Sequence, residues 1–314
     1  MIELIPVDGI GEVTPGTDLA ALVLAHVEVH DGDVVVITSK IVSKALGLAT
    51  TQPKAEVIAA STDRVVARRG ATTIVRTTQG LTLAAAGVDA SNVEAGVVLP
   101  LPPDADAVAR QLRADLHERT GRRVAVVISD TAGRAWRVGQ TDIALGCAGL
   151  APFESFAGRV DAYGNELAVT SPAVADEVAG AAELATGKLG QRPISVVRGL
   201  DASLLLDDDG PGAAALIRDE HGDLFGLGAR DAVVAALGGG PTRGFPRLTE
   251  DEAAALDLVA LAAPGDLDVT ANGDTFTVHA RPDQLVEAGM FKQRLLSAAV
   301  AHGLAASVEV ERSA

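Results

Sequence analysis

Val124-Ala125-Val126-Val127-Ile128-Ser129-Asp130-Thr131-Ala132-Gly133-Arg134-Ala135-Trp136-Arg137-Val138-Gly139 is a run of apolar, strand-forming residues followed at once by polar ones. Its continuous apolar first part predicts a strand that is buried on both faces. An acid, a hydroxyl, a glycine and two arginines follow, with the chain's only tryptophan between the arginines. We therefore expect a strand that carries polar side chains to the edge of a sheet.

The polar residues of this segment suit metal and anion binding. Asp130 and Thr131 offer the oxygen atoms that Mg²⁺ or Mn²⁺ prefers, and Arg134 and Arg137 offer planar guanidinium groups suited to phosphate or carboxylate. Asp, Thr and Gly after a strand are also ordinary turn residues. The alternative for this segment is therefore a plain strand exit in which Asp130 caps the next turn.

A second buried strand is predicted at Val34–Ile37, after the turn Asp31-Gly32-Asp33. It leads into Thr38-Ser39-Lys40-Ile41-Val42-Ser43-Lys44, which holds two of the chain's five lysines. Hydroxyl and ammonium groups in this position could hold a polyphosphate. The alternative is a solvated helix start capped by Ser39. Gly187-Lys188 is not a P-loop, because no Ser or Thr follows it and no glycine stands at the required earlier position. Any nucleotide must therefore be bound by a different motif.

The segment Ala84–Val93 is a third candidate for ligand contact. Small residues followed by Asp89, Ser91 and Asn92 predict a tight loop in which the backbone can approach a ligand closely. Asp89 is a second candidate metal ligand if the fold brings it near Asp130. The alternative is an Asx turn, in which the Asp89 side chain bonds only its own loop.

Composition excludes several classes of function. The formal net charge of -16 argues against binding a nucleic-acid backbone. No apolar stretch reaches the roughly 20 residues that a membrane helix needs, and the N-terminal residues lack the basic start of a secretory signal. We expect a cytoplasmic protein with neither nucleic-acid nor membrane partners. Cys147 lies in an apolar run and is expected to be a buried hydrophobic residue rather than a nucleophile.

Helix and strand signals are mixed along the chain and follow no fixed repeat, which predicts a mixed α/β (α+β) fold. A helix is expected at Lys54–Ala67. Gly238-Gly239-Gly240-Pro241 predicts a linker between domains at 1–240 and 246–314. The second domain is expected to be a small α-β-β-α-β appendage, with a capping box at Thr249–Glu252 and a hairpin turn at Asn272-Gly273. The sequence gives this domain no motif and no role.

Six segments taken together resemble the coenzyme F420-0:L-glutamate ligase family, in the family's order and near its spacing over about residues 1 to 228. They are Pro6-Val7-Asp8-Gly9, the stretch Asp31–Lys44, Ala86-Gly87-Val88-Asp89-Ala90-Ser91-Asn92, Ile128–Arg137, Tyr163-Gly164-Asn165-Glu166-Leu167 and Val196-Val197-Arg198-Gly199.

The resemblance implies a GTP-dependent acid–amino-acid ligase. Such an enzyme adds L-glutamate to the lactyl carboxylate of F420-0, and then a second, γ-linked glutamate, through an acyl phosphate. Two divalent ions, Mg²⁺ or Mn²⁺, and K⁺ are implied as cofactors. The implied fold is an intertwined homodimer with the site at the subunit interface. Some fused relatives carry an FMN-binding domain after the ligase; the tail here is too short for one, so no FMN is expected.

The resemblance also assigns residues by position. Guanine-nucleotide contacts fall on Ile10, Gly11, Glu12, Val13, Ser39, Lys40, Lys44 and Asn92, metal ligands on Asp89, Asp130 and Thr131, and catalytic roles on Asp130, Lys44 and Arg134. Arg134 and Arg137 are expected to hold the incoming glutamate or the phosphodiester of F420-0. Where archaeal-type members have Gly-Glu-Gly-Gly, this chain has Gly187-Lys188-Leu189-Gly190, which leaves the role of Lys188 open.

Three other classes of function remain open at this point. A metal-dependent nucleotide phosphohydrolase would use the same acids and lysines without an acceptor. A non-catalytic protein that binds an F420-type cofactor would need Arg134, Trp136 and Arg137 but not Asp89 or Asp130. A structural subunit would need none of them, and the number of polar groups at strand ends argues against it.

Overall fold

The computed structural model describes residues 1–91, 93–219, 223, 225–238, 253 and 256–313. Its contacts divide the chain into two compact units. Unit 1 comprises Met1–Arg64 and Gly70–Ile217, and unit 2 comprises Val65–Arg69 and Arg218–Ala314. Asn92, most of the predicted linker and the predicted capping box lie outside the described residues, so the domain boundary at residue 240 stays a prediction.

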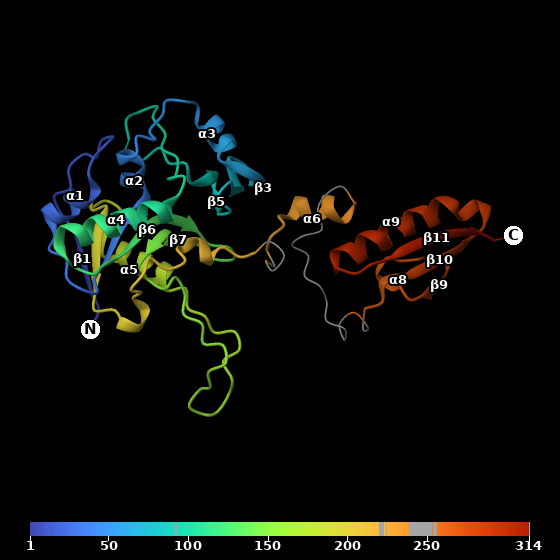
Figure 1. Cartoon of the computed structure of the whole chain (residues 1–314). Coiled ribbons are helices and arrows are strands. Elements are labelled where there is room, and N and C mark those ends of the chain that lie inside the picture. Colours follow the sequence, from blue (N-terminus) through green and yellow to red (C-terminus); the bar gives the residue numbers. More distant parts are fainter. Residues whose placement is uncertain (92, 220–222, 224, 239–252, 254–255, 314) are drawn as a thin grey trace. The chain divides into compact units, whose positions relative to one another are not determined.

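Unit 1 is built on a five-stranded sheet in the order β1-β8-β2-β6-β7 (Figure 1). The strands are β1 (Glu3–Pro6), β2 (Val34–Thr38), β6 (Ala125–Gly133), β7 (Gln140–Ala148) and β8 (Ile194–Arg198). β2 and β6 are parallel, and the other neighbours are antiparallel. Helices and strands of both orientations in one chain confirm the predicted mixed α/β class.

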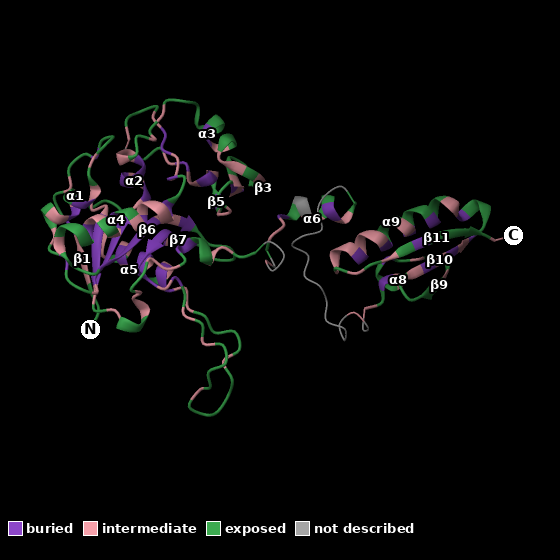
Figure 2. Cartoon of the chain, in the orientation of Figure 1, coloured by how far each residue is buried: buried purple, intermediate pink, exposed green. Residues whose placement is uncertain are grey.

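Alternate side chains of β2 and β6 enter two different cores, which explains their continuous apolar sequence. Val35, Ile37, Val126 and Ile128 pack with residues of α1 (Leu19–His26) and α4 (Ala105–Thr120). Their neighbours Val34, Val36, Ala125 and Val127 pack with α5 (Val174–Thr186) on the other face. Figure 2 shows the buried residues concentrated in these central strands. Each buried Val or Ile side chain contributes about 1.5–3 kcal/mol, so the centre of the sheet is the most stable part of unit 1.

Capping residues set the ends of the long helices. The Asp18 side chain accepts the backbone N–H of Ala21 at the start of α1, and Asp104 does the same for Ala107 at the start of α4. α4 ends at Gly121, which has a left-handed φ of 68°. In the described part of the chain, no helix combines the length and the apolar character that a membrane span requires.

The helix predicted at Lys54–Ala67 is wrong beyond Ala60. α3 covers Lys54–Ala60, and the chain then continues as β3 (Thr62–Arg69). β-Branched Thr62, Val65 and Val66 favour an extended backbone over a helix. β4 (Thr72–Thr77) and β5 (Thr82–Ala84) form an antiparallel pair and lead into the short 3-10 helix η1 (Ala85–Gly87).

Unit 2 contains a three-stranded sheet in the order β11-β10-β9. β9 (Asp268–Asn272) and β10 (Thr275–Ala280) are antiparallel, which confirms the hairpin predicted at Asn272-Gly273. β11 (Ser307–Arg312) pairs in parallel with β10. α9 (Leu285–Ala301) buries Phe291 and Leu295 against Phe276 and Val278 of the sheet. The remaining elements are α6 (Ala229–Ala236), α8 (Leu258–Leu261), η4 (Pro282–Gln284), and, in unit 1, α2 (Ser39–Ala45), η2 (Ala202–Leu204) and η3 (Ala213–Leu216).

Cys147 on β7 has no exposed surface. Burial raises the pKa of its thiol to about 12, and nearby carboxylates act in the same direction. Because the thiolate is the reactive form of cysteine, this side chain is chemically inert in the folded protein. The prediction of a buried hydrophobic residue is confirmed.

A buried ion pair ties the start of β2 to the end of β8. Asp33 has no exposed surface and accepts hydrogen bonds from the Nε and Nη2 atoms of Arg198, each at 2.8 Å. Its carboxylate also accepts the backbone N–H of His30 at 2.7 Å. The Asp33 hydrogen bond raises the pKa of Arg198. Within the Val196-Val197-Arg198-Gly199 segment, Arg198 therefore stabilises the sheet through its ion pair with Asp33.

Arg198→Met is expected to lower the free energy of unfolding by about 3 kcal/mol, because it leaves the Asp33 carboxylate buried without its partner. Urea denaturation followed by circular dichroism measures this loss. Arg123→Met is the matched control: Arg123 pairs with Asp207, and both side chains are mostly exposed, at 71% and 94%. The control is expected to cost less than about 1 kcal/mol. Equal losses in the two variants would contradict the structural role of Arg198.

Candidate functional site

β6 extends further than the sequence suggests. It runs to Gly133, so Asp130 and Thr131 lie within the strand and not in a loop after it. The pairing of β6 with β7 shifts between Ile128 and Ser129 and then continues, with Thr131 opposite Asp142. Since side chains alternate along a strand, Asp130 points to one face of the sheet and Ser129 and Thr131 point to the other.

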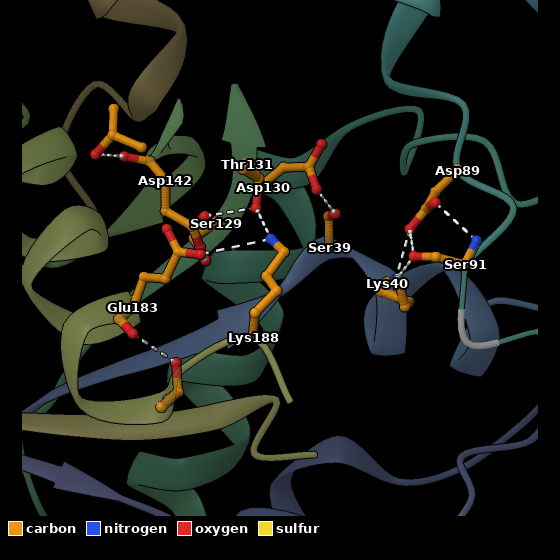
Figure 3. A network of polar contacts seen from close by, with 12 residues as sticks. Ser39, Lys40, Asp89, Ser91, Ser129, Asp130, Thr131, Asp142, Glu183 and Lys188 are labelled. Atoms are coloured by element: carbon orange, nitrogen blue, oxygen red, sulfur yellow. Dashed lines mark hydrogen bonds and ion pairs between the residues drawn. The ribbon is translucent and has the colours of Figure 1, made fainter. Parts of the chain in front are cut away.

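Asp130 faces the start of α2. The Ser39 hydroxyl donates to Asp130 Oδ1 at 3.1 Å, and Figure 3 shows the two side chains pointing toward each other. The pKa of Asp130 is raised to about 6, chiefly by burial; the Ser39 hydrogen bond opposes this rise, and the negative charges of Asp142 and Asp89 add to it. Among the described residues, no ion pair includes Asp130. This carboxylate therefore lacks a fixed counter-charge.

Asp89 forms both an Asx turn and an ion pair. Its Oδ1 atom accepts the backbone N–H groups of Ala90 and Ser91 at 2.7 and 2.8 Å, as the turn alternative requires. Its Oδ2 atom pairs with Lys40 Nζ at 2.5 Å and accepts the Ser91 hydroxyl at 2.8 Å. Burial opposes ionisation of this carboxyl, but the hydrogen bonds from Lys40 and Ser91 outweigh it and lower the pKa of Asp89 to about 2.

Consecutive residues of α2 connect the two carboxylates. Ser39 contacts Asp130 and Lys40 contacts Asp89, and the charge of Asp89 acts on the titration of Asp130 (Figure 3). Within the described ranges, no three acidic, histidine or cysteine side chains form a group that could hold a metal. A Mg²⁺-type ion commonly takes one or two protein carboxylates and completes its shell with water and phosphate oxygens. Asp89 and Asp130 fit that pattern.

A second polar cluster lies on the other face of β6; Thr131 and Lys188 were singled out from the sequence, whereas Asp142 and Glu183 were not. Asp142 is buried and accepts the hydroxyls of Ser129 at 3.0 Å and Thr131 at 2.8 Å. Glu183 of α5 lies beside it: burial, followed by the negative charge of Asp142, raises the pKa of Glu183. Lys188 Nζ lies 2.5 Å from Thr131 Oγ1 and 3.4 Å from Glu183 Oε1. An acid inside the apolar run of β7 was the sequence signal for Asp142.

The remaining predicted residues divide into two groups. The loop of Ile10, Gly11, Glu12 and Val13 reaches α2, where Glu12 Oε1 accepts Lys44 Nζ at 2.6 Å. Arg134 and Arg137 instead lie exposed in the turn between β6 and β7, and Arg134 donates to the carbonyl of Val138 in the same turn. Among the described contacts, none joins Arg134 to Asp89, Asp130 or Lys40.

Ammonium groups, hydroxyls and carboxylates thus meet at the adjoining ends of β2 and β6, in an arrangement suited to phosphate groups and a divalent cation. The sequence pattern of the family described as F420-0:Gamma-glutamyl ligase matches residues 9–55 and 48–199, which include both polar clusters. The chain belongs to this family, as the sequence resemblance predicted.

Curated relatives agree with this assignment. The coenzyme F420:L-glutamate ligase of Methanothermobacter thermautotrophicus is 38% identical over 250 residues, which cover 71% of this chain and 98% of the relative. The protein of the same name from Archaeoglobus fulgidus is 38% identical over 222 residues, covering 64% of this chain and 89% of the relative. That from Haloarcula marismortui is 35% identical over 256 residues, covering 73% and 98%.

The raised pKa of Asp130 predicts how stability depends on pH when no metal is bound. Between the unfolded pKa near 4 and the folded pKa of about 6, the folded state keeps a proton that the unfolded state has lost, so stability falls as pH rises through this window. Asp130→Asn lacks this titration. In EDTA, from pH 4 to pH 7, wild type is expected to lose about 2 kcal/mol relative to Asp130→Asn.

Urea denaturation at successive pH values measures this difference. Asp63→Asn, which changes an exposed carboxylate of β3, is the control and is expected to follow the wild-type profile. An Asp130→Asn variant that tracks wild type over the whole pH range would contradict the environment described for Asp130.

Proposed function

We propose that this protein is a GTP-dependent ligase that adds L-glutamate to the lactyl carboxylate of F420-0, and then a γ-linked glutamate. The proposal is supported by membership of the F420-0:Gamma-glutamyl ligase family and by relatives named coenzyme F420:L-glutamate ligase. The observation that carries it is the joint placement of Ser39 with Asp130 and of Lys40 with Asp89 at one edge of the sheet.

Lys40 and Lys44 are the proposed partners of the GTP polyphosphate. Each ammonium group already lies against a carboxylate, Asp89 for Lys40 and Glu12 for Lys44. Both carboxylates are partly exposed, at 40% and 74%, so water can solvate them when a phosphate takes their place. Once Lys44 binds a phosphate, Glu12 would be released. The loop Ile10–Val13, which is itself part of the proposed guanine-nucleotide contacts, would then be free to bind the nucleotide. Asn92 completes the proposed nucleotide set.

Asp89 and Asp130 would hold a divalent ion, Mg²⁺ or Mn²⁺. The fit rests on the Asp130 carboxylate, which is partly buried and has no ion pair among the described residues. When bound, such an ion offsets the negative charge on phosphate oxygens in the transition state. The resemblance also implies Thr131 as a metal ligand, but its side chain lies on the other face of β6 from Asp130, where its hydroxyl contacts Asp142 and Lys188. K⁺ is part of the proposal without an assigned residue.

The proposed reaction has two steps because a carboxylate is a poor electrophile. The lactyl carboxylate attacks the γ-phosphorus of GTP, forming an acyl phosphate and releasing GDP. The amine of glutamate then attacks the acyl carbon, inorganic phosphate leaves, and the amine loses a proton. Lys40 and Lys44 offset the charge of the departing GDP. Arg134 and Arg137 are the proposed holders of the glutamate or of the F420-0 phosphodiester.

The site is proposed to lie at the interface of an intertwined homodimer. Large apolar side chains on two projecting segments of unit 1 are exposed: Trp136 and Val138 in the β6–β7 turn, and Tyr163 and Val169 in the segment that follows β7. Figure 1 shows the segment between β7 and α5 extending away from the sheet. Exposed apolar groups of this size are characteristic of interaction surfaces, and a second copy would cover them.

Mass spectrometry of F420-0 incubated with the protein, GTP, L-glutamate and Mg²⁺ tests the proposed activity. The expected products are F420-0 carrying one and then two glutamyl residues, together with GDP. Loss of GTP without acceptor or glutamate would instead favour a phosphohydrolase. Binding of F420-0 without any turnover would favour a cofactor-binding protein.

Asp130→Ala is expected to lower the rate of GDP release about 100- to 1,000-fold, because it removes a proposed ligand of the ion that offsets transition-state charge. Circular dichroism should show an intact fold. Asp63→Ala, which removes an exposed acid, is the control and should retain wild-type turnover. Near-normal turnover by Asp130→Ala would contradict the role given to this carboxylate.

A further inference from the structure

Lys188 reaches the polar end of β6 from the segment that follows α5. α5 ends at Gly187, whose φ of 64° turns the chain away from the helix axis. The Lys188 side chain then lies against Thr131 of β6 and Glu183 of α5, with its Nζ atom 2.5 and 3.4 Å from their oxygens. Figure 3 shows its ammonium group extending toward Thr131 and Glu183.

The ammonium group of Lys188 occupies the position beside the Thr131 hydroxyl that a metal ion bound to Thr131 would need. The single hydroxyl hydrogen of Thr131 is donated to Asp142, and its oxygen accepts from Lys188. Ligand oxygens lie about 2.0–2.6 Å from a Mg²⁺ or Ca²⁺ ion, a distance close to that of the Lys188 contact. A divalent ion on Thr131 would therefore lie next to a positive charge and be repelled by it.

The same ammonium group compensates the acids of the cluster. Asp142 is buried and Glu183 is partly buried, and burial followed by the charge of Asp142 raises the pKa of Glu183. Lys188 acts in the opposite direction and favours the charged form of Glu183. A positive charge near this pair is needed because two adjacent carboxylates in a partly buried site cannot both ionise easily without one.

The two faces of β6 thus differ in their charge balance. On one face, the ammonium group of Lys188, whose side chain is 67% exposed, contacts Thr131 and Glu183. On the other face, Asp130 has no ion pair within the described part of the chain, and Lys40, which pairs with Asp89, is also a proposed phosphate partner. A divalent ion has a place beside Asp130 and none beside Thr131.

We propose that Lys188 is a built-in counter-cation of the site, and that the chain therefore binds one divalent ion, at Asp130, rather than the two that the family resemblance implies. The inference rests on the cation-binding role of Asp130 within the proposed function. Lys188 is a positioning residue: it fixes the Thr131 hydroxyl and offsets the charge of Glu183 without contacting the reacting groups.

Titration of the metal-free, full-length protein with Mn²⁺, followed by the electron paramagnetic resonance signal of free Mn²⁺, tests this proposal. Wild type is expected to bind one ion per chain, and Asp130→Asn is expected to lose it. Lys188→Gln is expected to bind two ions per chain, because Thr131 and Glu183 then lack their positive partner. Lys54→Gln makes the same change in net charge at an exposed position of α3 and is expected to bind one.

A double variant assigns the additional ion. Lys188→Gln combined with Glu183→Gln is expected to bind one ion per chain again, since the carboxylate beside Thr131 is gone. Lys188→Arg keeps the positive charge and is expected to bind one ion. Two ions on wild type would overturn the proposal, and this result needs no variant to fold. One ion on a folded Lys188→Gln variant would also overturn it.

The titration contains no GTP, glutamate or F420-0. Failure of the ligase assay would therefore leave its result unchanged. Conversely, a ligase that forms the expected products could still bind two ions, in which case the proposed function would stand and the role of Lys188 would not.

Discussion

The parallel pairing of β2 with β6 is the constraint on which the site depends. Its register sets Thr38 opposite Ser129, so the residues that follow, Ser39 and Asp130, reach the same edge of the sheet together. Both strands are buried on both faces, and this burial stabilises the pairing far more than any polar contact at its end. A shift of one residue would turn Asp130 away from α2 and toward the opposite face.

Under the proposed function, a chain with a net charge of -16 would receive highly anionic substrates through local charge balance. Three of its five lysines lie near this edge, each against a carboxylate: Lys40 with Asp89, Lys44 with Glu12 and Lys188 with Glu183. In the proposed function, the pairs on the α2 side exchange a carboxylate for a phosphate. In our proposal the pair on the α5 side supplies the counter-charge that a second ion would otherwise give.

Much of this arrangement was predictable from local sequence, because it depends on strands with continuous apolar runs and on the polar residues that end them. Ser39, Lys40, Asp89 and Asp130 were all predicted, and the structure brings them into contact in two linked pairs. Asp142 and Glu183 were not predicted, because their contact depends on the shifted register of β7 and on the packing of α5, neither of which is encoded in a short motif. Arg134 lies in an exposed turn, where its contact among the described residues is with Val138 of the same turn and not with a residue of the site.

Anomalous diffraction at the manganese edge, from crystals grown with Mn²⁺ and GDP, tests the central claim most directly. The account predicts a manganese peak within coordination distance of the Asp130 carboxylate, on the face of β6 that meets α2, with phosphate oxygens completing its shell. A manganese ion bound elsewhere, with Asp130 still bonded to Ser39 alone, would contradict it.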